Sequence, residues 1–221
     1  MVTLLSKLRY IILSKFFSLL YHQFAFGYDF VSNFVSLGLW KSWIYSVESY
    51  ISGAKILEIG HGPGHLLCYL RNKGFWVTGL DESWQMIQQA KNNCDKIGQR
   101  INSVNGNANF LPFQGNSFDQ VVTTFPSNFI IDPLTLSEIH RILIPDGSLV
   151  IVPAAWITGK LWVHRLMAWL FKITEQSPVS SEEFTQNWVD IFKESGFFVS
   201  YESKNLETSL VFIIIAKKLR Q

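Results

Sequence analysis

Short apolar runs and longer amphipathic stretches alternate along the middle of the chain. The run at 56–59 is typical of a parallel strand covered on both faces. Strands and helices alternate from there to Pro153, which predicts an α/β fold with a parallel sheet and right-handed crossovers. The elements expected outside this region are helices at 4–24, 39–51 and 156–172, a helix opened by a capping box at 180–183, and strands at 197–202 and 209–217.

The size and composition favour one compact unit. The chain has 221 residues, and no internal repeat or low-complexity linker divides it. We expect residues 1–52 to form an N-terminal helical lid and residues 53–221 the main domain. Charged residues make up only 16% of the chain, against about 25% in typical globular proteins. The net charge of +2, without a basic run interleaved with aromatic residues, argues against a nucleic-acid partner.

Cysteine and histidine give no sign of a metal or redox centre. Cys68 and Cys94 have no metal or redox spacing and fall on predicted helices, so they are expected to be core or surface thiols of a cytosolic protein without a disulfide framework. The five histidines are scattered, and no His/Cys cluster supports a metal site.

A glycine-rich turn follows the first predicted strand. Gly60, Gly62 and Gly64 let the backbone approach a ligand closely, and the free N–H groups of the next helix face the same cavity. The third glycine of a dinucleotide fingerprint is replaced by His65, which disfavours a pyrophosphate ligand. Glu58, an acid inside the strand, favours a ligand with a positively charged end. The alternative is a tight strand-to-helix turn that binds nothing.

This motif resembles that of the class I S-adenosylmethionine-dependent methyltransferases, and the resemblance covers roughly 55–153. In that family the glycine turn wraps the amino acid and ribose portions of the cofactor, and an acid at the end of the second strand holds the ribose hydroxyls. The resemblance gives that role to Asp81, followed by Glu82, although a helix cap is the alternative for Asp81. It implies a Rossmann-like sheet of seven strands, mostly parallel with an antiparallel last strand, with helices on both faces and extra N-terminal helices.

A third block, at 106–113, resembles the adenine loop of the family. Asn107 stands where the family commonly has Asp, so its amide can accept a hydrogen bond without the help of charge. The resemblance also places Ala108 and Thr124 against the cofactor. Phe110 could line the adenine face or belong to the core.

The segment at 21–43 resembles the entry segment of ubiquinone/menaquinone biosynthesis C-methyltransferases. Ala25, Tyr28 and Asp29 match that pattern, which makes Tyr28 a candidate for a catalytic lid residue. The stretch at 124–128 lacks the usual residues of those enzymes, so the resemblance supports only a small lipophilic acceptor, such as a quinol, phenol or lipid.

Methyl transfer from a sulfonium needs alignment and exclusion of water more than a catalytic dyad. The acceptor must still lose a proton, and His61 is the first candidate for a catalytic base, with His22 and His140 weaker. The alternative for His61 is a turn residue whose ring points to solvent. Two other functions stay open: a non-catalytic module that binds the cofactor, a lipid or a partner, and an NAD(P)-dependent oxidoreductase.

Two segments suit the surface of a membrane. Residues 4–20 are apolar with basic but no acidic side chains, yet too interrupted to span a bilayer or serve as a signal peptide. In a helix at 156–173, Trp162 and Trp169 share one face, opposite Arg165 and Lys172. Packing on the sheet or in a dimer explains this face equally well. These features predict a cytoplasmic enzyme that visits the inner face of the membrane.

Overall fold

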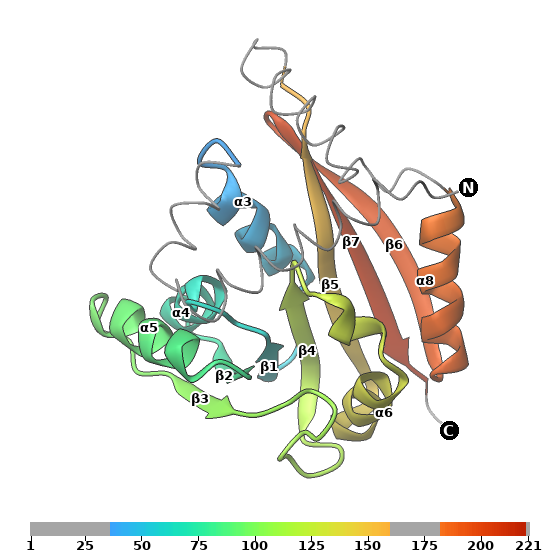
Figure 1. Ribbon diagram of the computed structural model, residues 1–221, viewed down its shortest axis with the longest axis horizontal. Helices are drawn as coiled ribbons and strands as arrows, with labels where there is room; N and C mark the ends of the chain where they lie inside the picture. Colours follow the sequence, from blue (N-terminus) through green and yellow to red (C-terminus); the bar gives the residue numbers. More distant parts are fainter. Residues whose placement is uncertain (1–35, 160–181, 220–221) are drawn as a thin grey trace, which may run out of the picture.

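A computed structural model describes residues 36–159 and 182–219 (Figure 1). The elements are α3 (Trp40–Tyr45), the 3-10 helix η1 (Ser46–Tyr50), β1 (Lys55–Ile59), α4 (His65–Asn72), β2 (Trp76–Asp81), α5 (Trp84–Asp95), β3 (Asn102–Asn105), β4 (Phe118–Thr124), the 3-10 helix η2 (Asn128–Ile131), α6 (Pro133–Ile142), β5 (Leu143–Ile157), α8 (Glu182–Glu194), β6 (Phe197–Leu206) and β7 (Ser209–Lys218).

The strands form one seven-stranded sheet in the order β3-β2-β1-β4-β5-β7-β6. The pairs from β3 to β5 are parallel, whereas β7 runs antiparallel to both of its neighbours, β5 and β6. This arrangement confirms the predicted mostly parallel sheet of seven strands with an antiparallel last strand.

Two apolar cores cover the two faces of the sheet, because successive strand residues point to opposite sides. Leu57 and Ile59 of β1 pack with side chains of α6 and α8, whereas Ile56 packs with side chains of α3 and α4. The strand β1 is thereby buried on both faces, as the apolar residues Ile56, Leu57 and Ile59 predicted. Figure 1 shows α3, α4 and α5 grouped on one side of the sheet and α6 and α8 on the other.

The strand β5 is longer than the sequence suggested. It pairs with β7 as far as Ile157 opposite Ser209, so residues 156–157 belong to a strand and not to the helix expected at 156–172. The rest of that segment lies outside the described residues, as do residues 4–20. Among the helices that the structure describes, none is long and apolar enough to cross a membrane.

The two cysteines form a disulfide between α4 and α5, so the prediction of two separate thiols is wrong. Cys68 and Cys94 lie 26 positions apart, and no local spacing connects them. Packing of the two helices brings their Cα atoms to 5.2 Å, a separation that a disulfide spans.

Candidate functional site

The candidate site lies where the glycine turn leaves the carboxyl end of β1. The sheet order runs away from β1 in both directions, through β2 and β3 on one side and β4 and β5 on the other. Such a reversal of strand order opens a crevice at the carboxyl ends of the strands, which is where open α/β sheets bind ligands.

The three glycines of the turn have different reasons to be glycine. All have positive φ angles, of 69° at Gly60, 53° at Gly62 and 79° at Gly64. A Cβ atom at Gly64 would lie 2.6 Å from the Cβ of Ala90, so this glycine lets α5 pack against the turn. A Cβ at Gly62 would meet nothing within 4 Å. Gly62 therefore borders open space, as a close approach of the backbone to a ligand requires.

Asp81, at the end of β2, ties the glycine turn to the start of α5. Its two carboxylate oxygens accept hydrogen bonds from the backbone N–H groups of Gly62 and Ser83, each at 2.8 Å. The N-cap of α5 is Ser83, whose Oγ accepts from the N–H of Met86 at 3.3 Å, so the helix-cap alternative for Asp81 is wrong. A carboxylate has about four acceptor positions, which leaves Asp81 able to accept further bonds from a ligand.

Glu58 is a buried acid without a full set of partners. Its side chain is 2% exposed, and its Oε2 atom has no hydrogen-bond partner. Burial, with a smaller effect of the nearby Asp81 carboxylate, raises the pKa of Glu58 well above 4.5. A cation placed beside this carboxyl group would stabilise its ionised form and so lower the pKa of Glu58. The chemistry of Glu58 therefore fits the positively charged amino acid end of S-adenosylmethionine.

His61 is buried, and its ring does not point to solvent, so that alternative is wrong. Its Nδ1 lies 2.8 Å from the carbonyl oxygen of Gly62, to which it must donate, and its Nε2 lies 2.6 Å from Oγ of Ser103. The ring fits against Gly79, where a Cβ would come within 2.6 Å of it. Burial lowers the pKa of His61 and favours the neutral ring. With both nitrogens engaged, His61 braces the turn, and its role as a base stays a prediction.

The loop after β3 carries the residues expected at the adenine. The Oδ1 atom of Asn107 accepts from the N–H of Asn109 at 2.8 Å, and its Nδ2 donates to Oε1 of Glu82 at 3.2 Å. Ala108 is buried beneath the loop, whereas Phe110 is 75% exposed, which excludes the core alternative for Phe110. The structure thus brings Asn107 and Glu82 together on the rim of the crevice.

Thr124 ends β4 in a half-buried position near the same edge of the sheet. Tyr28 and His22 lie outside the described residues. His140 packs edge-on against the ring of Phe197 at a centroid distance of 5.3 Å. No group of three metal-ligating side chains occurs within the described ranges 36–159 and 182–219.

An aromatic cluster beside the turn was missed in the sequence. Phe125 directly follows β4 and has a φ of 50°, which is strained for a bulky side chain. Its ring stacks on Trp40 at 4.3 Å and lies 6.2 Å from the ring of Trp43. Phe129 of η2 lies against Gly60, 3.5 Å from the position of a Cβ there. The aromatic residues were visible in the sequence, but nothing local indicated the backbone strain or the stacking.

Comparisons with known proteins agree with this geometry. A family model described as a methyltransferase domain matches residues 56–147. The chain is 30% identical to a ubiquinone/menaquinone biosynthesis C-methyltransferase of Blochmanniella floridana, over 64% of this chain and 59% of that protein. It is 28% identical to a demethylmenaquinone methyltransferase of Thermotoga maritima, over 88% and 93%. The crystal structure of a methyltransferase of Methanosarcina mazei, described as SAM-dependent, superposes with a TM-score of 0.57 at 26% identity, over 80% of this chain and 98% of that one.

Proposed function

Because the chain belongs to the class I S-adenosylmethionine-dependent methyltransferases, we propose that it transfers a methyl group to a small lipophilic acceptor by in-line displacement. Two observations together carry the cofactor half of this proposal. Glu58 is a buried acid with an unpartnered oxygen, and the backbone at Gly62 borders open space. When bound, S-adenosylmethionine supplies an activated methyl group on a sulfonium.

The chain itself contributes binding and orientation. Glu58 would hold the cationic end of the cofactor, the glycine turn would follow its amino acid portion, and Asp81 would accept from the ribose hydroxyls. Glu82, Asn107, Ala108 and Thr124 would complete the pocket, with Asn107 at the adenine. Holding acceptor and methyl donor in line away from water supplies much of the rate of such a reaction, so no catalytic dyad is required.

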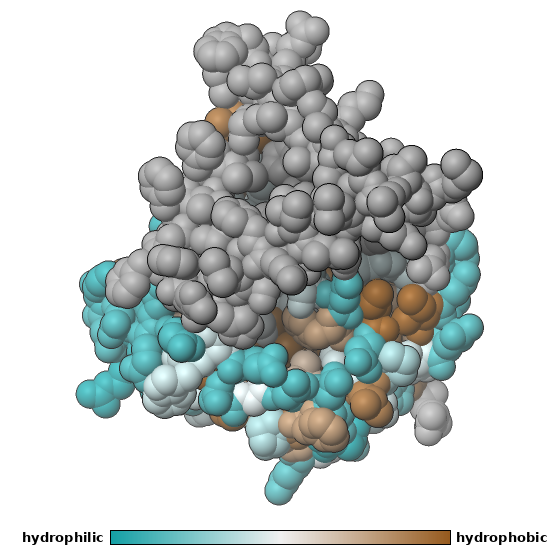
Figure 2. Space-filling model, viewed as in Figure 1, coloured by the Kyte–Doolittle hydropathy of each residue, from teal (hydrophilic) through white to brown (hydrophobic). Residues whose placement is uncertain are grey.

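The acceptor half rests on the aromatic cluster formed by Trp40, Trp43 and Phe125, and on Phe129, which lies separately against Gly60. Phe125 keeps a left-handed backbone that costs about 1–2 kcal/mol, and such strain tends to persist where function requires it. Flat aromatic side chains suit a planar apolar ring. On the face seen in Figure 2, apolar side chains also gather around η2 and the start of α6. Relatives named for quinone biosynthesis make quinols and phenols the first acceptors to test.

The first experiment is calorimetric titration with S-adenosylmethionine and S-adenosylhomocysteine, with NADH as a control for the oxidoreductase alternative. We expect binding of the first two ligands alone, followed by methylation of a demethylated quinol or a phenol. Binding without turnover on any lipophilic acceptor would support the non-catalytic module. A folded protein that binds neither ligand would refute the proposal.

We further propose peripheral contact of a cytoplasmic enzyme with an anionic membrane through 4–20 and 156–173, of which residues 156–157 end β5. Both segments lie almost wholly outside the described residues, and the proposal rests on their sequences. Replacing Trp162 and Trp169 together by Glu should abolish sedimentation with anionic vesicles. The absence of vesicle binding by the parent protein would dismiss the idea.

A further inference from the structure

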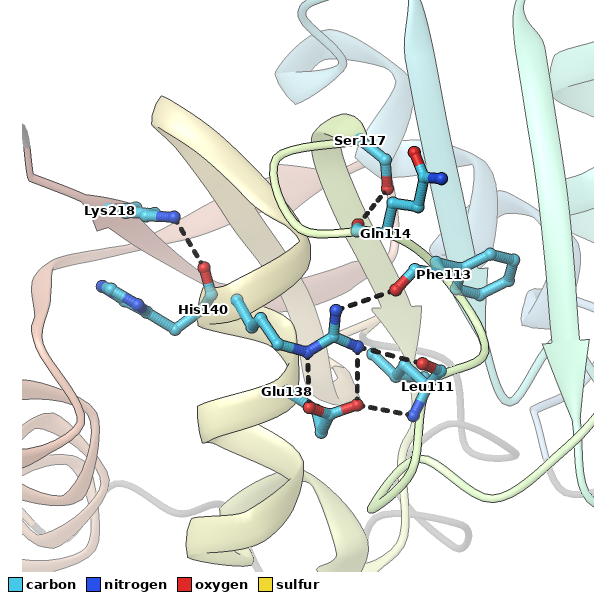
Figure 3. Close-up of polar contacts among 8 residues, drawn as sticks. Leu111, Phe113, Gln114, Ser117, Glu138, His140 and Lys218 are labelled. Carbon is cyan, nitrogen blue, oxygen red and sulfur yellow. Dashed lines mark hydrogen bonds and ion pairs between the residues drawn. The ribbon is translucent and has the colours of Figure 1, made fainter.

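The loop between β3 and β4 makes most of its hydrogen bonds to other elements with α6; residues 106 and 107 also bond to the end of β2 and Asn116 to Lys218. The loop has no regular secondary structure between Asn105 and Phe118. Its contacts with α6 involve residues from the first to the last turn of the helix. Figure 3 shows the central part of this connection, where Glu138 faces Leu111 of the loop and the carbonyl of Phe113 meets the guanidinium of Arg141.

Glu138 and Arg141 form the centre of the connection. Two guanidinium nitrogens of Arg141 donate to the two carboxylate oxygens of Glu138, at 2.6 and 2.8 Å. The same guanidinium donates to the carbonyl oxygens of Leu111 and Phe113, at 3.0 and 2.8 Å. Glu138 in turn accepts from the N–H of Leu111 at 2.8 Å, and its bond to Arg141 lowers the pKa of Glu138. The pair thus bonds three backbone groups of the loop, although the carbonyl of Leu111 also accepts from the N–H of Phe113 at 2.8 Å.

The first turn of α6 holds the start of the loop. Thr135 donates from its hydroxyl to Oδ1 of Asn109, and Nδ2 of Asn109 donates to Asp132 at 3.4 Å. Asn109 also donates its backbone N–H to Asn107, the residue expected at the adenine. The position of Asn107 is therefore connected to α6 through a single residue.

The last turn of α6 holds the end of the loop. The carbonyl oxygens of Arg141 and Ile142 accept from the N–H groups of Asn116 and Ser117, at 3.0 and 2.8 Å. Lys218 of β7 donates to the carbonyl oxygens of His140 and Leu143, at 2.8 and 2.6 Å, and so caps the helix. The C-terminal carbonyls of α6 are satisfied by the loop on one side and by Lys218 on the other.

From this geometry we propose that Glu138 and Arg141 are positioning residues, which fix the 107–113 loop in the conformation that recognises the adenine of the cofactor. The inference rests on the proposed function, since it assumes that the cofactor binds here. A loop held in its binding conformation before the ligand arrives loses less conformational entropy on binding. Their contacts with the loop are to Leu111 and Phe113, so the effect passes through the backbone of these two residues.

The test compares two ligands that differ at position 6 of the purine and at the neighbouring N1, which accepts a hydrogen bond in adenine and carries a proton in hypoxanthine. S-Adenosylhomocysteine carries an amino group at position 6, and S-inosylhomocysteine carries a carbonyl oxygen in its place. We expect the parent to prefer the adenosyl ligand. Arg141→Lys removes the planar fork that reaches both carbonyls, and should weaken binding of the adenosyl ligand about tenfold, the effect of one or two lost hydrogen bonds. The variant should lose less affinity for the inosyl ligand. The preference ratio, which is the affinity for the adenosyl ligand divided by that for the inosyl ligand, should therefore fall towards one.

Two further variants separate positioning from stability. Glu138→Gln keeps the size of the side chain, loses the charged pair, and should also reduce the preference ratio. Lys218→Met removes the cap of α6 and the bond from Nζ to Oδ1 of Asn116 at 3.1 Å, but no bond to the 107–113 loop. It should lower the melting temperature while keeping the ratio. An unchanged ratio in folded Arg141→Lys and Glu138→Gln proteins would overturn this inference alone. A parent that binds neither ligand would overturn the proposed function and this inference with it.

Discussion

Replacing Glu58 by Gln should make the protein more stable at neutral pH and weaker in binding its cofactor. The parent keeps a carboxyl group at 2% exposure, with one oxygen unpartnered and the Asp81 carboxylate nearby. Ionising such a group in the native state is expensive, so it stays protonated above the pH at which the unfolded chain releases its proton. Glutamine has nearly the same shape and carries no charge.

The magnitude follows from the raised pKa of Glu58. Above pH 4.5 the unfolded chain binds fewer protons at this position than the native protein does, so stability falls as the pH rises. Each pH unit between 4.5 and the raised native pKa lowers the free energy of unfolding of the parent by about 1.4 kcal/mol. The loss is complete once the pH passes the native pKa. In a chain of this size, each unit corresponds to about 3–5 °C in melting temperature.

The assay is urea denaturation of parent and Glu58→Gln at several pH values from 5 upward, without cofactor. The difference between the two proteins should grow with pH in favour of the variant. Glu207→Gln, the same change in an exposed turn between β6 and β7, should stay within about 0.5 kcal/mol of the parent at every pH. A Glu58→Gln protein that is less stable at neutral pH, or a difference independent of pH, would refute the reasoning.

The same variant tests the ligand. A charge-assisted hydrogen bond contributes about 1.5–3 kcal/mol, so Glu58→Gln should bind S-adenosylmethionine at least tenfold more weakly at neutral pH. In the parent a bound cation favours ionised Glu58, so binding releases a proton and affinity should rise with pH. The affinity of Glu58→Gln for S-adenosylmethionine should not show this rise with pH. Equal affinities and equal pH dependence would show that Glu58 does not meet the cationic end of the cofactor.

Three other predictions concern the turn and the helices around it. Gly64→Ala should destabilise the fold by about 2 kcal/mol or more, because the added Cβ collides with Ala90. Gly62→Ala should cost only the left-handed backbone strain of about 1–2 kcal/mol, but should reduce cofactor affinity. Denaturation and calorimetry on both variants check this contrast. In Asp81→Asn the single side-chain oxygen can accept from only one of the two backbone N–H groups. The variant should therefore be less stable by about 1–2 kcal/mol and should bind the cofactor more weakly. Unchanged cofactor affinity would remove Asp81 from the pocket. Reduction of the disulfide should lower the free energy of unfolding by about 3–4 kcal/mol, as expected for a loop of 26 residues, and dithiothreitol should have no effect on a Cys68→Ser, Cys94→Ser protein.

The sequence was most informative where local pattern determines structure. The apolar run of β1 and the glycines after it predicted the strand, the turn and the edge of the sheet at which the site lies. Contacts between distant parts of the chain could not be predicted in this way. The ring of His61 turns inward because Gly79 leaves room for it and Ser103 supplies a partner 42 positions away. The disulfide depends on the packing of α4 and α5, which no spacing in the sequence reveals.

The position of β7 has a consequence for the order in which the protein can be completed during synthesis. β7 is the last strand along the described chain, yet it lies between β5 and β6 in the sheet. Until it inserts, the apolar strand β5 has an open edge, which is a site where a nascent chain can pair with its neighbours. Lys218, which caps α6, arrives with the same strand. A chaperone that shields the edge of β5 would therefore protect the nascent protein at the stage when the C-terminus of α6 is still uncapped.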